Sequence, residues 1–256
     1  MTRRAARSEP DDPAAAPAHD RPWASRFWYE VIRLTAFVLF TATGGFRSGG
    51  RHNMPAAGGI LLISNHVSFL DVFVLGVSLH RQLNYVARST LFVPVLGAFI
   101  RSVGGFPIQR DGMGASGLKE TLRRLRNGGV VILFPEGTRS EDGRLGALKS
   151  GISVLAKRAR VPIVPAAMAG SFEAWPRHRL FPRPHPIRIE YGPAIYPAEV
   201  ADLPPEAVTA LLHDRILDCH RRAIRGLAFD LGVNLPPPDV MTVRDKRPLG
   251  ESPGFD

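Results

Sequence analysis

Short apolar runs alternate, through the middle of the chain, with segments that place apolar residues at helical spacing. The runs predict buried strands at 60–63, 84–87, 105–108, 130–134, 161–166 and 187–191. The segments between several of them predict helices at 69–80, 91–102, 114–127 and 146–159. Strands that alternate with helices favour an α/β fold, here a single domain with a mixed, largely parallel sheet flanked by helices.

A hydrophobic helix is predicted before this alternating region, at 23–46. The stretch 34–46 carries no charge, but its thirteen residues fall short of the ~20 apolar residues that a membrane-spanning helix needs. Extending it back to Phe27 brings in Glu30 and Arg33. We therefore expect a membrane-associating helix that lies in one leaflet. A single span is the second interpretation, and a core helix of the domain is the third.

The remaining segments complete the predicted organisation. Residues 1–22 are rich in Ala, Pro, Arg and Asp, and residues 233–256 are rich in Pro and charge, so both are expected to be disordered tails. The domain itself is expected at 47–232 and closes with an amphipathic helix, or a bent pair, at 205–231. Segment 168–186 is predicted to be a loop, whose arginine and aromatic residues suit a lipid headgroup interface or an ordinary surface.

The charge balance narrows the possible partners. A net charge of +10 over 256 residues predicts an anionic partner: nucleic acid, anionic lipid or a phosphorylated substrate. The arginines match no known nucleic-acid-binding motif, so no nucleic acid is expected. The single cysteine, Cys219, excludes an intramolecular disulfide and a cysteine-rich zinc site. The histidines lack metal-ligand spacing, so no metal is expected.

Candidate chemistry follows two of the predicted strands. Residues 64–71 (SNHVSFLD) follow the first strand, and residues 134–140 (FPEGTRS) stand at the end of the fourth. In largely parallel sheets, ligands sit beyond the carboxyl ends of the strands. His66 and Glu136 are therefore expected to face one crevice.

The spacing of His66 and Asp71 constrains where each can lie. Residues five apart are about 140° apart around one helix, so the side chains meet only if His66 lies in the turn and Asp71 in the first helical turn. Ser68 as the helix N-cap would fit this placement. The alternative is an ordinary capping box of Ser68 and Asp71, which leaves His66 as a loop histidine.

Four blocks occur in a fixed order along the chain. They are Asn65-His66-x4-Asp71, Gly105-Phe106-Pro107-Ile108-Gln109-Arg110, Phe134-Pro135-Glu136-Gly137-Thr138-Arg139-Ser140 and Val161-Pro162-Ile163-Val164-Pro165. Together they resemble the glycerolipid acyltransferase family, typified by 1-acyl-glycerol-3-phosphate (lysophosphatidic acid) acyltransferases. The resemblance covers roughly residues 55–195, and the first and third blocks are its specific parts. One departure is Leu148-Lys149-Ser150-Gly151, where the family commonly has Phe-Lys-x-Gly.

The resemblance implies acyl transfer from acyl-CoA or acyl carrier protein to the free hydroxyl of 1-acyl-glycerol 3-phosphate, giving phosphatidic acid. His66 would be the general base, and Asp71 would hold its imidazole in one tautomer. No cofactor beyond the acyl donor is expected. The expected substrate-binding residues are Asn65, Arg110, Glu136, Gly137, Thr138, Arg139 and Lys149.

Distinct roles are expected within this set. Arg139 or Arg110 would bind the acceptor phosphate with two parallel hydrogen bonds. Glu136 would orient one of these arginines or accept a hydrogen bond from a glycerol hydroxyl. Asn65 would brace the turn, and Lys149 would assist with phosphate.

The expected partners are acyl-CoA or acyl carrier protein, a lysophospholipid acceptor and an anionic membrane surface. The expected location is the cytoplasmic face of the inner or plasma membrane. The first alternative keeps the chemistry and changes the acceptor to glycerol 3-phosphate, another lysophospholipid or an acylated amino-acid lipid. The distant alternative is a non-catalytic protein that binds anionic lipid or nucleic acid, which leaves the His66–Asp71 spacing unexplained.

Overall fold

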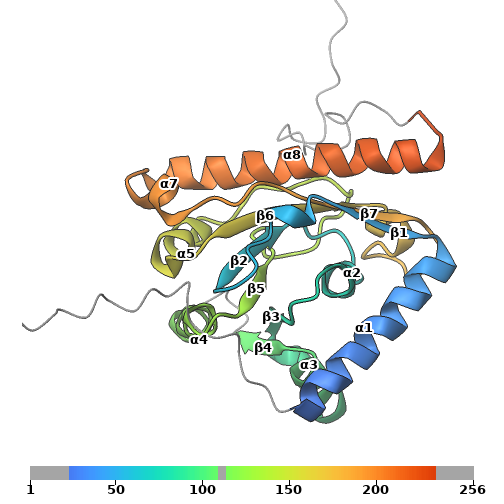
Figure 1. Ribbon diagram of the computed structural model, residues 1–256, viewed down its shortest axis with the longest axis horizontal. Helices are drawn as coiled ribbons and strands as arrows, with labels where there is room; N and C mark the ends of the chain where they lie inside the picture. The colour runs from blue at the N-terminus through green and yellow to red at the C-terminus, as the bar shows by residue number, and fades with distance from the viewer. Residues whose placement is uncertain (1–22, 109–113, 235–256) are drawn as a thin grey trace, which may run out of the picture.

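The computed structural model describes residues 23–108 and 114–234. Within them the sheet has seven strands in the order β1-β7-β6-β2-β5-β3-β4 (Figure 1). The strands are β1 (Phe46–Gly49), β2 (Ile60–Ser64), β3 (Leu83–Arg88), β4 (Gly105–Ile108), β5 (Val130–Leu133), β6 (Ile163–Ala169) and β7 (Ile187–Tyr191). Neighbouring strands run parallel, except that β6 and β7 are antiparallel. The predicted α/β class with a mixed, largely parallel sheet is confirmed.

Helices cover both faces of this sheet. They are α1 (Trp23–Thr43), α2 (Asp71–Ser78), α3 (Pro94–Ser102), α4 (Ala115–Arg126), α5 (Gly151–Ala159), α6 (Ser171–Ala174), α7 (Pro197–Ala201) and α8 (Pro205–Leu231), with 3-10 turns η2 (Arg51–Asn53) and η3 (Ser89–Leu91). One face packs against α4, α5, α7 and α8, and the other against α1 and α2. In Figure 1, α8 lies along one side of the sheet and α1 runs along the opposite side.

The central strand β2 shows why its sequence is an unbroken apolar run. It lies between β5 and β6, and all five of its residues are buried. Leu61 and Ile63 point into the core under α4, α5 and α8, while Ile60 and Leu62 point into the core under α1 and α2. A strand buried on both faces needs apolar residues at every position.

Several element boundaries differ from the prediction. The strand expected at 161–166 is β6, which continues to Ala169 with every residue buried. Its last residues are small alanines and one methionine, a weak strand signal. The expected helices begin later, α3 at Pro94 and α5 at Gly151. A proline at the first helical position is favourable, because its fixed φ suits the helix and its missing N–H needs no partner there.

Strand β1, helices α6 and α7 and the 3-10 turns η2 and η3 were not predicted. Strand β1 begins at the end of the segment expected to be helical, and α6 lies within the segment 168–186 that was expected to be a loop. In contrast, the amphipathic pattern at 205–231 forms the single helix α8. The tails expected at 1–22 and 233–256 lie outside the described residues, apart from Val233 and Asn234.

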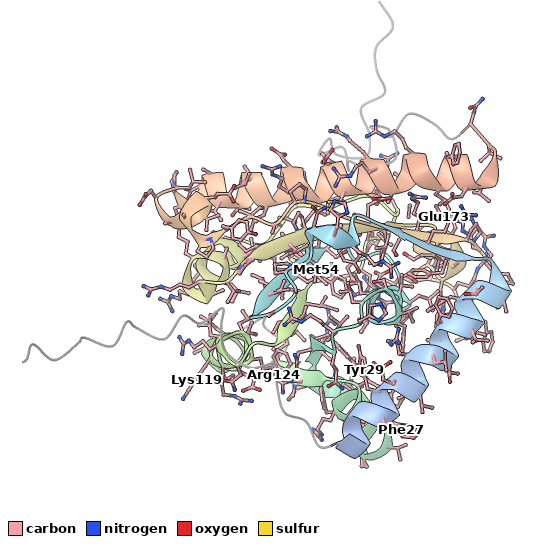
Figure 2. The ribbon with its side chains drawn as sticks, in the orientation of Figure 1. Phe27, Tyr29, Met54, Lys119, Arg124 and Glu173 are labelled. Carbon is pink, nitrogen blue, oxygen red and sulfur yellow. The ribbon has the colours of Figure 1, made fainter. Side chains whose placement is uncertain are left out.

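The N-terminal helix α1 is shorter than the predicted 23–46 and ends at Thr43. It rests on the domain through Tyr29 and Phe40, which are buried. Figure 2 shows Tyr29 on the inner side of α1 and Phe27 on the outer side. In the part of the chain that the structure describes, no helix combines the length and apolarity needed to cross a membrane.

Candidate active site

His66 lies just beyond the carboxyl end of β2, at the edge of the sheet where the parallel strands end. Its Nδ1 is 2.8 Å from Oδ2 of Asp71, the first residue of α2. The predicted placement, with the histidine in the turn and the carboxylate in the first helical turn, is confirmed. A carboxylate can only accept, so Nδ1 carries the proton and Nε2 is the basic nitrogen. Within the described residues, Nε2 has no hydrogen-bond partner.

The Asp71 carboxylate is fully buried but well supplied with donors. Its Oδ2 also accepts hydrogen bonds from the backbone N–H groups of Val67 (2.7 Å) and Ser68 (2.8 Å). Its Oδ1 accepts a hydrogen bond from the Ser171 hydroxyl at 2.9 Å. These hydrogen bonds, together with the one from the imidazole, hold the Asp71 carboxylate in a fixed orientation behind His66.

Ser68 does not cap α2 as predicted. The residue preceding the helix is Leu70, and no side chain caps it. The Ser68 hydroxyl accepts from the Leu70 N–H and donates to the Trp175 carbonyl. Half of the alternative capping box is present, because Asp71 accepts from the Ser68 N–H. That bond coexists with the bond to His66, so the capping interpretation and the catalytic one are compatible.

The third block holds His66 from the other side. The Phe134 ring stacks on the imidazole, with centroids 4.0 Å apart and planes 15° apart. The Ser140 N–H donates to the His66 carbonyl at 2.7 Å. The Glu136 Oε1 accepts a hydrogen bond from the backbone N–H of His66 at 2.8 Å. The turns that follow β2 and β5 are thus one unit in space, as expected from neighbouring parallel strands.

Glu136 connects backbone segments and does not contact an arginine. Its Oε2 accepts from the Gly146 N–H at 2.9 Å, and the side chain is almost fully buried. Burial raises the pKa of Glu136 to about 7, against the two N–H donors that lower it, and the charges of Asp71 and Asp142 raise it further. The expectation that Glu136 orients Arg139 is wrong, because both oxygens are occupied by backbone N–H groups.

The remaining third-block residues form an exposed rim. Gly137 has a left-handed φ of 72°, and a Cβ there would lie 2.6 Å from Cε of Lys149. The positive φ favours glycine at this position, whereas the end of the Lys149 side chain could move away from a Cβ. Thr138 and Lys149 are exposed, and the Lys149 N–H donates to the Pro135 carbonyl. The structure brings these three predicted residues together.

Arg139 lies on an aromatic platform. Its Cζ is 3.3 Å from the centroid of the Phe69 ring, which packs in turn against Trp175 at 5.1 Å. Its Nη1 is buried and has no hydrogen-bond partner in the described structure. Burial lowers the pKa of Arg139, and the nearby positive charges of Arg177 and Arg88 lower it further. An unpartnered guanidinium N–H in a positive environment is suited to binding an anion.

Asn65 lies just after β2 and links that strand to β6. Asn65 is fully buried, and its amide exchanges two hydrogen bonds with the Met168 backbone, at 3.1 and 2.9 Å. It braces the turn, as expected, by tying the end of β2 to β6. Both amide atoms bond to the protein backbone, so the geometry supports the bracing role, and its assignment as a substrate-binding residue stays a prediction. Arg110 lies outside the described residues.

The sequence did not identify Ser171, Arg88 or Phe69 as site residues. Arg88 is the last residue of β3 and Ser171 comes two residues after β6, so both lie at the carboxyl end of a strand, as His66 does. That position was the available signal for Arg88. The signal for Ser171 was hidden because the strand before it was predicted to end three residues too early. For Phe69, nothing in the sequence indicated that its ring would lie under a guanidinium.

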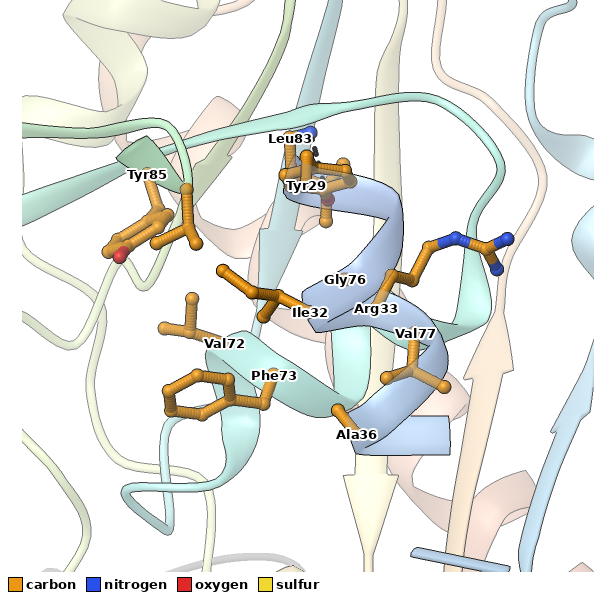
Figure 3. Close-up of a pocket in the computed structure, with 11 residues that line it drawn as sticks. Tyr29, Ile32, Arg33, Ala36, Val72, Phe73, Gly76, Val77, Leu83 and Tyr85 are labelled. Carbon is orange, nitrogen blue, oxygen red and sulfur yellow. Dashed lines mark hydrogen bonds between the residues drawn. The ribbon is translucent and has the colours of Figure 1, made fainter. Parts of the chain in front are cut away.

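An apolar pocket of about 40 Å³ opens between α1 and α2 (Figure 3). The Tyr29 hydroxyl at its wall accepts from the Leu83 N–H at 3.3 Å. The lining residues are Tyr29, Ile32, Arg33, Ala36, Val72, Phe73, Gly76, Val77, Leu83, Tyr85 and Val103. One lining residue, Val72, follows Asp71 directly in the sequence. Among the described residues, no three His, Cys, Asp or Glu side chains gather as metal ligands would.

Comparison with known proteins places this arrangement in a family. Residues 45–169 match the model of the family described as acyltransferase. The 1-acyl-sn-glycerol-3-phosphate acyltransferase of Bacillus subtilis is 30% identical over 191 residues, which are 72% of this chain and 93% of that protein. This chain belongs to the acyltransferase family. The predicted resemblance and enzyme class are confirmed.

For another relative, the matched residues make up a smaller share of that protein's length. The chloroplastic acyltransferase LPAT1 of Arabidopsis thaliana, named for the same activity, is 31% identical over 159 residues. Those residues are 60% of this acyltransferase but 44% of the plant protein. The crystal structure of the 1-acyl-sn-glycerophosphate acyltransferase PlsC from Thermotoga maritima has the same fold, with a TM-score of 0.67 at 22% identity and 85% coverage of both chains.

Proposed function

We propose that this acyltransferase transfers a fatty acyl group to the free hydroxyl of 1-acyl-glycerol 3-phosphate, giving phosphatidic acid. The donor would be acyl-CoA or acyl carrier protein. The relatives named for this activity support the acceptor. The observation that carries the proposal is the 2.8 Å contact between His66 Nδ1 and buried Asp71, with Nε2 left unpaired.

The proposed reaction needs no covalent intermediate on the protein. His66 Nε2 takes the proton of the acceptor hydroxyl as its oxygen attacks the thioester carbonyl. The new C–O bond forms, the C–S bond breaks, and the imidazolium returns its proton to the departing thiolate. Asp71 stabilises the imidazolium between these steps. Cys219 is unsuited to act as a nucleophile, because burial on α8 raises its pKa to about 12.

Arg139 is the proposed ligand of the acceptor phosphate. Its buried Nη1 lacks a partner, and a phosphate oxygen would supply one. Arg88 and Arg177, whose charges are felt at Arg139, would add to the positive potential of the entrance. Thr138 and Lys149 on the exposed rim would contact the outer oxygens. We propose that the acyl chain extends towards the apolar pocket between α1 and α2.

We further propose that α1 places the enzyme on the cytoplasmic face of the inner or plasma membrane, lying in one leaflet. Its outer face exposes apolar side chains, namely Phe27, Trp28, Val31, Leu34, Phe37, Val38 and Leu39. The Trp28 indole N–H donates to the Ser102 hydroxyl, which joins α1 to α3. Helix α3 exposes Val95, Leu96 and Phe99. Large exposed apolar surfaces of this kind mark interaction with membranes or proteins.

The test is release of free thiol from acyl-CoA or acyl carrier protein in the presence of lysophosphatidic acid. His66→Ala and Asp71→Asn are each expected to lower turnover by orders of magnitude, about 10⁴ for loss of the orienting carboxylate in a comparable triad. His213→Ala is the matched control, because its partner Asp214 lies 3.6 Å away at the surface of α8. Undiminished turnover in His66→Ala would refute the mechanism.

An acceptor panel separates this proposal from its alternatives. Glycerol 3-phosphate, other lysophospholipids and an acylated amino-acid lipid are offered under the same conditions. Thiol release with one of these and not with lysophosphatidic acid would replace the proposed acceptor and keep the chemistry. No release with any acceptor and either donor would overturn the proposed reaction.

A further inference from the structure

The two oxygens of the Asp71 carboxylate have different partners. Oδ2 is shared by the imidazole and two backbone N–H groups, whereas Oδ1 accepts, among the described residues, only from the Ser171 hydroxyl. We propose that Ser171 is a positioning residue for the His66–Asp71 pair, because its hydroxyl fixes the rotation of the carboxylate. This inference rests on the proposed role of His66 as general base.

The Ser171 hydroxyl is presented by a rigid turn. Ser171 is the first residue of α6 and is fully buried. Gly170 before it has a left-handed φ of 88°, and a Cβ there would lie 2.1 Å from the Pro186 carbonyl oxygen. The chain can turn here only with glycine. The Trp175 N–H then returns to the Ser171 carbonyl at 2.9 Å, which closes the turn of helix.

Residues of the first block form hydrogen bonds with the chain both before and after α6. Before α6, the Asn65 amide exchanges two hydrogen bonds with the Met168 backbone. After α6, the Ser68 hydroxyl donates to the Trp175 carbonyl at 2.8 Å. Segments about a hundred residues apart in sequence are therefore held in register around Asp71. The position of the Ser171 hydroxyl follows from these bonds and not from local helix geometry alone.

The chemical consequence concerns the direction of the His66–Asp71 hydrogen bond. A carboxylate rotates about its Cβ–Cγ bond when one oxygen lacks a donor, and a buried oxygen without a donor is costly. With Ser171 in place, Oδ1 is satisfied and Oδ2 stays aimed at Nδ1. Without it, rotation towards other donors weakens the bond that sets the imidazole tautomer. The base at Nε2 is then presented for a smaller fraction of the time.

The experiment compares Ser171→Ala with Ser153→Ala in the full chain. Ser153 is the matched control, a buried serine of α5 whose hydroxyl donates to the Ser150 carbonyl at 2.8 Å, away from Asp71. We expect Ser171→Ala to lower kcat about tenfold, as loss of one hydrogen bond to a charged group does. The KM for the acceptor should be unchanged. Ser153→Ala should keep the wild-type kcat.

Two further readouts separate positioning from a merely structural role. The Nδ1 proton of His66 should give a low-field ¹H NMR resonance that disappears in His66→Ala, shifts in Ser171→Ala and stays in place in Ser153→Ala. In an Asp71→Asn background, Ser171→Ala should lower kcat little further, because the carboxylate through which Ser171 acts is gone. Additive losses in the double variant would contradict the proposal.

The possible failures are distinguishable. If His66→Ala abolishes turnover while Ser171→Ala keeps both the wild-type kcat and the resonance, the positioning role is overturned and the proposed function stands. If His66→Ala remains active, the proposed function itself fails. Should Ser171→Ala not fold, Ser171→Cys takes its place, with a weaker donor of similar size. It is expected to lower kcat and shift the resonance in the same direction, and wild-type values for both would overturn the proposal.

Discussion

The buried Glu136 should make the stability of this enzyme depend on pH in an unusual direction. Its folded-state pKa of about 7 lies above the ordinary value of 4.5, chiefly because of burial. Between these two values the folded protein holds a proton that the unfolded chain has released. The free energy of unfolding must therefore fall as pH rises from about 4.5 to about 7. Below and above this window, Glu136 contributes no slope.

The size of the effect follows from the same two values. Each unit of pKa difference corresponds to about 1.36 kcal/mol, so the full change is roughly 3 kcal/mol. Glu136→Gln removes the titrating group. The glutamine also loses one of the two backbone hydrogen bonds at His66 and Gly146, because an amide nitrogen cannot accept. That loss lowers the free energy of unfolding equally at every pH. The informative quantity is therefore how the free energy of unfolding changes with pH, and not its absolute value.

The measurement is urea unfolding of wild type and Glu136→Gln at pH 5 and pH 8. The wild type should lose more stability between these two conditions than the variant, by an amount on the order of 3 kcal/mol. Glu141→Gln, an exposed carboxylate of the same segment, should keep the wild-type slope. An unchanged slope in Glu136→Gln would show that the carboxyl group is already ionised at pH 5, and the burial argument would be refuted.

Two other predictions concern the entrance and the outer face. Phe69→Leu removes the ring beneath Arg139 and should raise the acceptor KM several-fold, by the ~0.5–2 kcal/mol of a cation–π contact, with kcat little changed; a lowered kcat at unchanged KM would contradict this. Leu34→Glu combined with Val38→Glu should reduce cosedimentation with anionic vesicles, whereas Ala210→Glu on α8 should not. Equal binding by all three proteins would place the membrane contact elsewhere.

The fold was predictable where burial is continuous or strongly periodic. The β2 run is apolar at each core position, and the leucines of α4 recur at helical spacing before Asn127. Strand β1 gave no such signal, because its four residues include Arg47 and two small residues at an outer edge of the sheet. Such a strand is specified by its long-range partner β7 and not by its own pattern.

The candidate site divides in the same way. His66 and Asp71 were predictable because the turn after β2 and the start of α2 are only five residues apart, and this spacing limits the geometry. The expected contact between Glu136 and Arg139 was mistaken, because the choice between an arginine and two backbone N–H groups depends on how the segment around Gly146 folds back. The role of Ser171 could not be predicted from the sequence, because its contact with Asp71 depends on the packing of β6 beside β2.

The pairing of β1 with β7 has a consequence for biosynthesis. Phe46 stands opposite Ile187, and the turn that carries Ser171 comes shortly before that partner strand. A ribosome therefore releases the histidine and aspartate long before the residues that complete their surroundings. Parallel pairing over such separations forms slowly, because the intervening chain must first close as a loop. Nascent chains should acquire turnover only once β7 has left the exit tunnel, which leaves no partially active form during synthesis.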